Sequence, residues 1–201
     1  PIAALVVNAA AYLVVEATSG QVLAESNQRQ RRDPASLTKL MTAYLVFDAL
    51  HQKKLSLTQR LRVPERAWKA EGSRMFIEPG APVTTEDLLR GLIVQSGNDA
   101  AVALAIAVAG NEGEFIARMN REAKRLGMND TQFLNPTGLS QQGHYSTAHD
   151  LAVLSLALLR DKRLSLTDIA LRCGFADQSH FIRCFREFLG VTPKAFRKLV
   201  L

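Results

Sequence analysis

The order of hydrophobic and polar residues near the start of the chain predicts a pair of strands and then a buried helix. Residues 11–25, AYLVVEATSGQVLAE, contain two β-rich runs on either side of Thr18-Ser19-Gly20, which is typical of an antiparallel hairpin with Gly20 at a positive φ. From Leu37 onward, the segment LTKLMTAYLVFDAL places apolar residues around most of a helical circumference. A helix with this pattern is buried on all sides.

Four further segments have the periodicity of helices: residues 85–94, 99–109, 112–126 and 148–160. The segment 99–109 is rich in alanine and apolar throughout, so we expect a second interior helix that ends at Gly110. Residues 135–138, NPTG, predict a turn before the last of these helices. The expected fold class is therefore α+β and mostly helical, with an N-terminal β-hairpin.

Residues 162–201 have a different pattern. The segment that begins at Arg163 reads RLSLTDIALRCGFADQSHFIRCFREFLGVTPKAFRK. Its pattern predicts two helices that meet at Gly174, which is the layout of a helix-turn-helix. A short closing helix should start at Val191-Thr192-Pro193. We therefore divide the chain into an α+β domain, residues 1–161, and an all-α tail, residues 162–201.

The charge is concentrated in the tail. Residues 1–160 contain 17 Lys and Arg against 15 Asp and Glu, whereas residues 161–201 contain 8 against 4. A basic tail is compatible with nucleic acid, with an anionic membrane or with solvated helices, so charge alone does not choose a partner. Cys173 and Cys184 form no disulfide framework, and His51, His144 and His149 have no ligand spacing, so we expect no metal and no cofactor.

The apolar N-terminus lacks the pattern of a targeting or membrane segment. It is interrupted by Asn8 and has neither a basic leader nor a cleavage pattern. It is also shorter than the ~20 apolar residues that a membrane helix needs. We expect neither a signal peptide nor a membrane segment in these residues.

Ser36 and Lys39 form an S-x-x-K pattern at the start of the predicted buried helix. Residues three apart lie on one helical face, so the amine can reach the hydroxyl. A serine needs a base to take its proton, and a lysine can serve only if burial or a nearby cation lowers its pKa. The helix N-terminus would also place the Ser36 N–H where an oxyanion develops. The alternative is a capping serine followed by an exposed lysine.

A second polar element, Gln95-Ser96-Gly97-Asn98-Asp99, follows Ser36 by sixty residues. By itself it could be a loop that caps the next helix. We expect the nearby Trp68, Met75 and Phe76 to be packing residues and not a substrate platform.

Together these blocks carry a family resemblance. PASLTKLMTAYLVF, SRMFIEPG, LLRGLIVQSGNDAAVALA, MNREAKRLGMNDTQF, NPTGL and HYSTAHDLAVLSLALLRD follow one another over about residues 10–161. In order and spacing they resemble the low-molecular-mass penicillin-binding proteins with serine D-alanyl-D-alanine carboxypeptidase activity, which implies a serine β-lactamase/transpeptidase-like fold. The resemblance implies that Ser36 is the acylated nucleophile, Lys39 its general base, Ser96 a proton relay to the leaving D-alanine and Asn98 a contact to the substrate amide. It also implies a peptidoglycan stem peptide or a β-lactam as the partner at Ser36.

One motif of that family is missing. Its pattern continues to a strand that bears Lys-Thr-Gly, whereas no Lys in these 201 residues is followed by Thr or Ser and then Gly. In the family this strand supplies the second oxyanion donor and the cation that receives the terminal carboxylate. Loss of one oxyanion donor costs about 10² to 10³ in rate. We therefore expect a truncated domain with an open hairpin edge and little or no peptidase turnover.

The tail resembles a second family. Over about residues 158–198, the residues IA, GF, SHF and GVTP resemble the second helix-turn-helix of AraC-type transcription regulators. The resemblance implies DNA as a partner of residues 164–198, with the following residues near bases or phosphates: Gln178, Ser179, His180, Arg183 and Arg186. A single unit should bind only at about 10⁻⁴ to 10⁻⁶ M, and a solvated helix face is the alternative.

Three hypotheses follow from these observations. The chain is an impaired serine carboxypeptidase-like protein, a DNA-binding regulator of AraC type, or an inactive chimeric scaffold. Location stays open, because the enzyme family works outside the cytoplasmic membrane and the regulators act in the cytoplasm.

Overall fold

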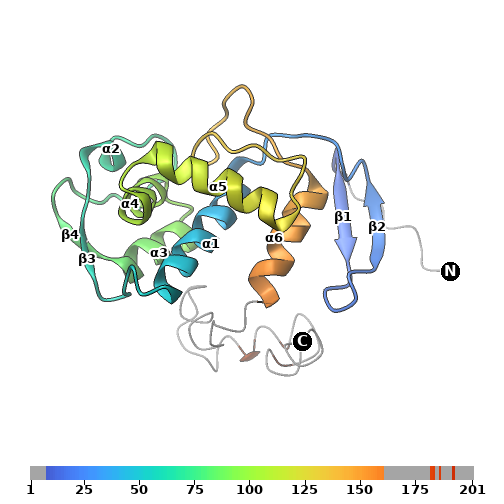
Figure 1. Cartoon of the computed structure of the whole chain (residues 1–201), viewed down its shortest axis with the longest axis horizontal. Coiled ribbons are helices and arrows are strands. Elements are labelled where there is room, and N and C mark those ends of the chain that lie inside the picture. The colour runs from blue at the N-terminus through green and yellow to red at the C-terminus, as the bar shows by residue number, and fades with distance from the viewer. Residues whose placement is uncertain (1–7, 161–181, 184–185, 187–191, 193–201) are drawn as a thin grey trace.

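The computed structural model describes residues 8–160 and, beyond them, Ile182, Arg183, Arg186 and Thr192. Its elements are β1 (Tyr12–Val15), β2 (Val22–Ser26), α1 (Thr38–His51), β3 (Arg60–Arg62), α2 (Glu65–Trp68), β4 (Pro82–Thr84), α3 (Thr85–Val94), α4 (Asn98–Ala109), α5 (Glu112–Leu126) and α6 (Ala148–Arg160). Helix α1 lies between the other helices, and the β1–β2 hairpin lies beyond α6 (Figure 1). The α+β, mostly helical class is confirmed.

The N-terminal hairpin has the predicted form. β1 and β2 are antiparallel, with Tyr12 opposite Ser26, and Gly20 has a φ of 73° in the turn. Among the described strands, β1 and β2 pair only with each other. Within the described residues no third strand pairs with either one, so the hairpin edges are open as expected, and Val22 and Leu23 on β2 are 45% and 56% exposed.

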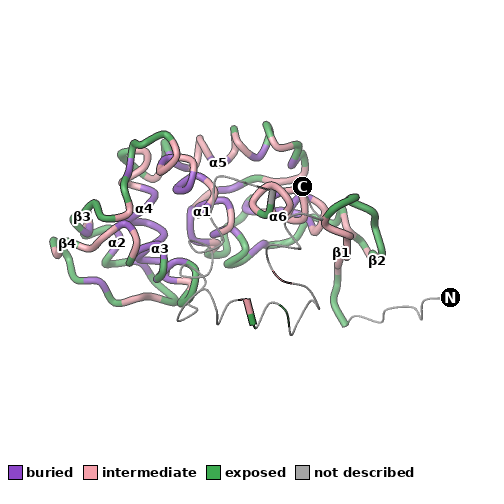
Figure 2. Tube along the Cα trace, turned by 90° about the horizontal axis from the view of Figure 1, so that it is seen from below, coloured by how far each residue is buried: buried purple, intermediate pink, exposed green. Residues whose placement is uncertain are grey.

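The two apolar helices are interior, as their patterns predict. Nine residues of α1 are buried, among them Met41 and Val46, and eight residues of α4 are buried, from Asn98 to Ala105. Figure 2 shows the buried part of the chain concentrated in these helices. α4 ends at Gly110, whose φ of 84° closes the helix as expected.

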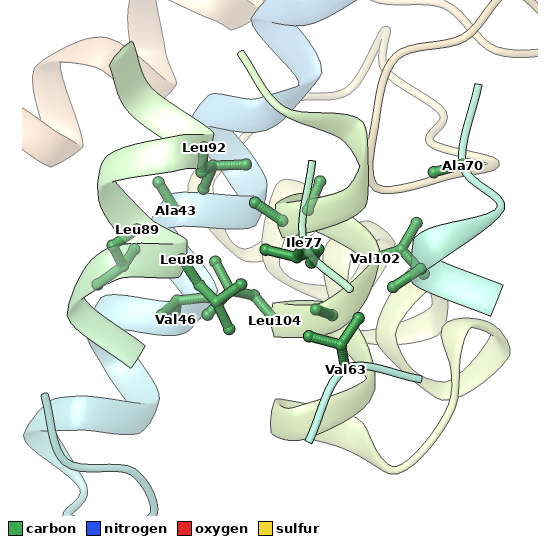
Figure 3. Packing of buried hydrophobic residues seen from close by; sticks show 14 of the residues in the cluster. Ala43, Val46, Val63, Ala70, Ile77, Leu88, Leu89, Leu92, Val102 and Leu104 are labelled. Atoms are coloured by element: carbon green, nitrogen blue, oxygen red, sulfur yellow. The ribbon is translucent and has the colours of Figure 1, made fainter. Parts of the chain in front are cut away.

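Helices α1 and α4 each contribute to two hydrophobic clusters. The first joins them to α3, with Leu88, Leu89 and Leu104 fully buried (Figure 3). The second joins them to α5 and α6 around Phe115 and Leu154. Each large side chain buried in this way contributes about 1.5–3 kcal/mol of transfer free energy. Helix α1 is therefore fixed by packing on two sides.

Three short elements were not predicted. β3 and β4 form a second antiparallel pair of three residues each, and α2 has four residues. Their lengths give too few positions for a period of 2 or 3.6 to show in the sequence. The β3–β4 pair forms because residues 60 and 84 meet in the folded chain.

Within the described residues, no single helix has the length and apolar composition needed to cross a membrane. α4 and α5 meet the test only as a pair, and the two are bent by 85° relative to each other.

Candidate active site

Ser36 lies in a short 3₁₀ turn, Ala35–Leu37, that precedes α1. The sequence placed it on the helix itself, and the structure corrects this by one turn. Lys39 lies in the first turn of α1, and residues three apart lie on the same side in both a 3₁₀ turn and an α-helix, so the spacing still brings the pair together. Ser36 is exposed, and its Oγ accepts a hydrogen bond from Lys39 Nζ at 3.2 Å.

Lys39 is buried, with 6% of its surface exposed. Its Nζ also donates to the main-chain carbonyl of Thr137 at 2.6 Å. Because burial penalises the ammonium form, the pKa of Lys39 falls from 10.5 to about 8. A carbonyl oxygen can only accept, so it always takes an N–H from Nζ. The lone pair of the neutral amine is thereby left for the Ser36 hydroxyl.

The turn that carries the Thr137 carbonyl is held by Asn135. Asn135 Oδ1 accepts from the Thr137 N–H, the Thr137 hydroxyl and the Gly138 N–H, at 3.2, 3.0 and 2.7 Å, and Nδ2 donates to the Leu139 carbonyl at 2.9 Å. From the other side, the Thr42 hydroxyl on α1 donates to the Pro136 carbonyl at 2.7 Å. The carbonyl that accepts from Lys39 is thus part of a turn held by several hydrogen bonds. The sequence predicted the turn but not this role.

The residue before Ser36 has an unusual backbone. Ala35 has a φ of 46°, which is uncommon for a residue with a Cβ and costs about 1–3 kcal/mol. Asp33 stabilises it by accepting from the Ala35 N–H at 2.9 Å. Ser140 donates to the same carboxylate, and this bond, followed by the Ala35 N–H, lowers the Asp33 pKa.

His144 is a structural contact that sequence reasoning missed. It is 4% exposed and connects the Thr38 hydroxyl, 2.9 Å from Nε2, to the Leu134 N–H, which donates to Nδ1 at 3.0 Å. Since Nδ1 is an acceptor, we assign the proton to Nε2. Burial lowers the pKa of His144, which favours this neutral form. The ring therefore fastens the start of α1 to the 134–140 turn.

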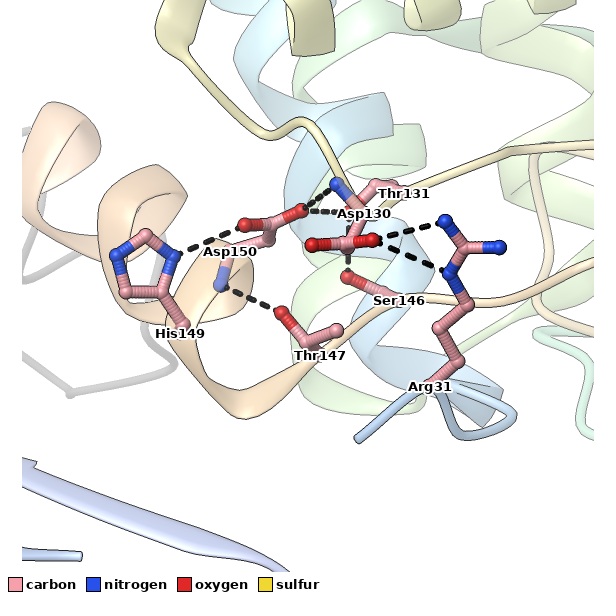
Figure 4. Close-up of polar contacts among 7 residues, drawn as sticks. All are labelled: Arg31, Asp130, Thr131, Ser146, Thr147, His149 and Asp150. Atoms are coloured by element: carbon pink, nitrogen blue, oxygen red, sulfur yellow. Dashed lines mark hydrogen bonds and ion pairs between the residues drawn. The ribbon is translucent and has the colours of Figure 1, made fainter. Parts of the chain in front are cut away.

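A buried carboxylate fixes the loop that leads to Ser36. Asp150, 1% exposed, accepts from the Asp130 N–H and the Thr131 hydroxyl, both at 2.8 Å (Figure 4). Asp130 in turn pairs with Arg31 at 2.8 Å. Main-chain bonds between residues 32 and 146 continue this attachment, so α6 supports the segment before Pro34.

Ser96 and Asn98 lie where α3 passes into α4. Ser96 has a φ of 55°, a second non-glycine residue in the left-handed region. Asn98 is 5% exposed, and its Nδ2 donates to the Glu71 carbonyl at 2.6 Å. Its Oδ1 has no hydrogen-bond donor among the described residues, so it is the atom left for a ligand.

The Ser36–Lys39 pair and the Ser96–Asn98 segment both lie close to the turn at residues 135–139. A Cβ placed at Gly72 would lie 2.8 Å from Asn98 Nδ2 and 3.9 Å from a Leu139 methyl, and one at Gly138 would lie 3.1 Å from the Ser36 nitrogen. The segment that contains Ser36 therefore lies on one side of residues 138–139, and the segment that contains Asn98 lies on the other. Among the described residues, no hydrogen bond joins Ser96 or Asn98 directly to the Ser36–Lys39 pair.

The expectation for the nearby apolar residues was correct for one of three. Met75 packs against the first hydrophobic cluster, but Trp68 is 43% exposed and Phe76 is 77% exposed. The backbone of Phe76 is also unusual, with a φ of 60°, and no local pattern in the sequence predicts such a conformation.

A cavity of about 360 Å³ adjoins the turn. Thr137 and Leu139 of the turn line this cavity. Its charged lining residues include Arg66, Lys69 and Glu71. Among the described residues, no group of three or more His, Cys, Asp or Glu side chains is arranged to hold a metal ion.

The structure describes two of the five residues that the sequence proposed for DNA contact. Gln178, Ser179 and His180 lie outside the described residues. Arg183 and Arg186 have helical backbone and exposed side chains.

The family model described as D-alanyl-D-alanine carboxypeptidase matches residues 2–172, and that of AraC-family helix-turn-helix proteins matches residues 159–198. The predicted boundary after residue 161 falls within the overlap and stays a prediction. Similar proteins include D-alanyl-D-alanine carboxypeptidase DacC of Escherichia coli, 45% identical over 161 residues, and DacF of Bacillus subtilis, 43% identical over 148 residues. The matches cover 77% and 74% of this chain but only 40% and 38% of those proteins.

Solved structures agree with this. DacD of Francisella tularensis has a TM-score of 0.79 at 37% identity, covering 83% of this chain and 40% of its own. Penicillin-binding protein D2 of Listeria monocytogenes, in an ampicillin-bound form, has a TM-score of 0.70 at 31% identity, covering 79% and 64%. These similarities confirm the expected transpeptidase-like fold class.

Proposed function

Because the chain belongs to the D-alanyl-D-alanine carboxypeptidase family, we propose that it forms a covalent acyl-enzyme at Ser36 with D-alanyl-D-alanine peptides or β-lactams. The observation that supports this most directly is the contact of 3.2 Å between Lys39 Nζ and Ser36 Oγ, with the amine buried. Burial brings the Lys39 pKa to about 8, close enough to neutrality for a general base. An ordinary capping serine with an exposed lysine would show neither feature.

The proposed reaction uses the chain's own residues. Neutral Lys39 takes the Ser36 proton while Oγ attacks the carbonyl of the penultimate D-alanine, which gives a tetrahedral oxyanion. When the C–N bond breaks, the proton held by Lys39 passes to the leaving nitrogen, and we assign Ser96 as the residue that relays it. The terminal D-alanine departs with that proton, and the Ser36 ester stays. Water then hydrolyses the ester, and Oγ regains its proton.

We further propose that the reaction is slow in these 201 residues, because they contain no Lys-Thr-Gly. One missing oxyanion donor lowers the rate by about 10² to 10³. Incubation with a fluorescent penicillin, followed by a denaturing gel, should show labelling over hours instead of minutes. The label should be absent in Ser36→Ala. Rapid labelling would contradict the impairment, and labelling that persists in Ser36→Ala would contradict the nucleophile.

A second candidate function rests on the AraC-family match at residues 159–198. We infer weak DNA binding by this part, since one helix-turn-helix unit makes few phosphate contacts. A gel-shift series should show retardation at about 10⁻⁴ to 10⁻⁶ M at physiological salt, and affinity should rise as salt falls. Arg183→Gln together with Arg186→Gln should weaken it further. Absence of any shift at low salt would rule this function out.

A further inference from the structure

Residues 71–77 are bound along the loop that carries Ser96 and Asn98. The contacts are Asn98 N–H to the Ser73 carbonyl at 2.7 Å, Asn98 Nδ2 to the Glu71 carbonyl at 2.6 Å, the Ser73 hydroxyl to the Gln95 carbonyl at 2.6 Å, and Met75 N–H to Asp99 Oδ1 at 3.0 Å. Asp99 is 1% exposed, and its carboxylate accepts from the Met75 and Ile77 N–H groups of this segment as well as from the Ala100 N–H of its own helix. The side chains of residues 71–77 that face solvent are therefore held beside the candidate active site.

Within this segment Phe76 is forced outward. Its φ of 60° is a rare conformation for an aromatic residue, and such strain persists only where the surroundings determine the backbone. The neighbours provide that determination, because Met75 packs against the core and Ile77 is 7% exposed. Phe76 itself is 77% exposed. A large apolar ring is thus presented to solvent on a rigid support.

Arg74 lies over that ring. Its guanidinium carbon is 5.1 Å from the ring centroid of Phe76, a cation–π contact that fixes its direction without neutralising its charge. Arg66 and Lys69, the cations that line the neighbouring cavity, pair with Glu112 and Glu65. Arg74 has no carboxylate partner among the described residues. A positioned guanidinium without an anion is suited to binding a carboxylate.

We propose that Arg74, supported on Phe76, binds a carboxylate of the donor peptide on the N-terminal side of its D-alanyl-D-alanine end. The proposal rests on the function proposed above. Asn98 Oδ1 is the atom left to receive an N–H of the peptide, and Arg74 lies on the segment bound directly to Asn98. In the proposed pose, the peptide beyond that amide runs along residues 71–77 and so reaches Arg74. Arg74 and Phe76 are specificity-determining residues and take no part in bond breaking.

The test compares two peptides that differ in one charge. γ-D-Glutamyl-L-lysyl-D-alanyl-D-alanine carries a free glutamyl α-carboxylate, and its partner carries an amide there. Binding is measured by NMR titration of the full chain with Ser36→Ala, which prevents turnover. We expect the carboxylate peptide to bind about fivefold more tightly, which is the upper range for an exposed ion pair. Arg74→Gln should remove this preference and leave the affinity for the amide peptide unchanged.

Arg90→Gln is the matched control, because Arg90 is an exposed arginine on α3 that already pairs with Glu86 at 2.9 Å. It should retain the full preference. Phe76→Ala, which removes the support of Arg74, should reduce the preference and leave the affinity for the amide peptide unchanged. A preference that survives Arg74→Gln, or equal affinity of the unsubstituted site for both peptides, overturns the proposal, as does failure of both to bind. Penicillin labelling of Ser36 is measured separately, so the acyl-enzyme proposal can stand when this one fails.

Discussion

Lys39→Met is expected to lower the rate of penicillin acylation at Ser36 by about 10³-fold, within the range that a general base contributes. Methionine keeps the length and apolar character of the side chain but cannot accept the Ser36 proton. In the unsubstituted chain the rate should rise as pH increases through about 8, where Lys39 loses its proton, and then level off. Intact-protein mass spectrometry of the adduct, from about pH 6 to about pH 10, measures both effects.

A measurement of thermal stability shows whether Lys39→Met lowers the acylation rate through its chemistry or through unfolding. The lowered pKa means that the folded chain disfavours the ammonium by roughly 3 kcal/mol below pH 8, a cost that falls as pH rises from about 8 to 10.5. Methionine removes that cost but leaves the Thr137 carbonyl without its donor, which costs about 1–3 kcal/mol. The two nearly cancel, so the melting temperature should change little. A rate without pH dependence in the unsubstituted chain would contradict Lys39 as the base.

Gly138→Ala is expected to reduce acylation by about 10²-fold and to lower the melting temperature. A Cβ at this position would lie 1.8 Å from the Ala35 carbonyl oxygen and 2.4 Å from its carbon. Both are backbone atoms of the residue that precedes the nucleophile, so relief of the overlap must shift Ser36 or the Thr137 carbonyl. A misplacement of about 1 Å is sufficient for a loss of this size. Labelling rates and thermal melts are the measurements.

Gly143→Ala is the control for backbone strain. Gly143 has a φ of 89°, close to the 85° of Gly138, but a Cβ there would meet only a Leu134 methyl at 3.5 Å, an ordinary contact. This variant should lose about 1–2 kcal/mol of stability and keep the acylation rate. Equal acylation in the two alanine variants would show that the Gly138–Ala35 contact does not position the nucleophile.

Much of the fold was determined by local sequence patterns. The hairpin turn at Gly20, the buried α1 and α4, and the end of α4 at Gly110 were all predicted, because each depends on residues that are neighbours along the chain. The short β3, α2 and β4 were not, since three or four residues carry no periodicity. The S-x-x-K spacing also predicted the Ser36–Lys39 contact, which is local.

The surroundings of that pair were decided only by the tertiary structure. The carbonyl that receives Lys39 belongs to Thr137, 98 residues away, and the hydroxyl of Thr38 meets His144 across 106 residues. A main-chain carbonyl is identical in every residue type, so no sequence motif could mark this one as the acceptor. The outward direction of Phe76 likewise arose from hydrogen bonds to Asp99 and packing of its neighbours. The sequence by itself determined which groups could react, and packing over long chain separations determined their protonation, direction and support.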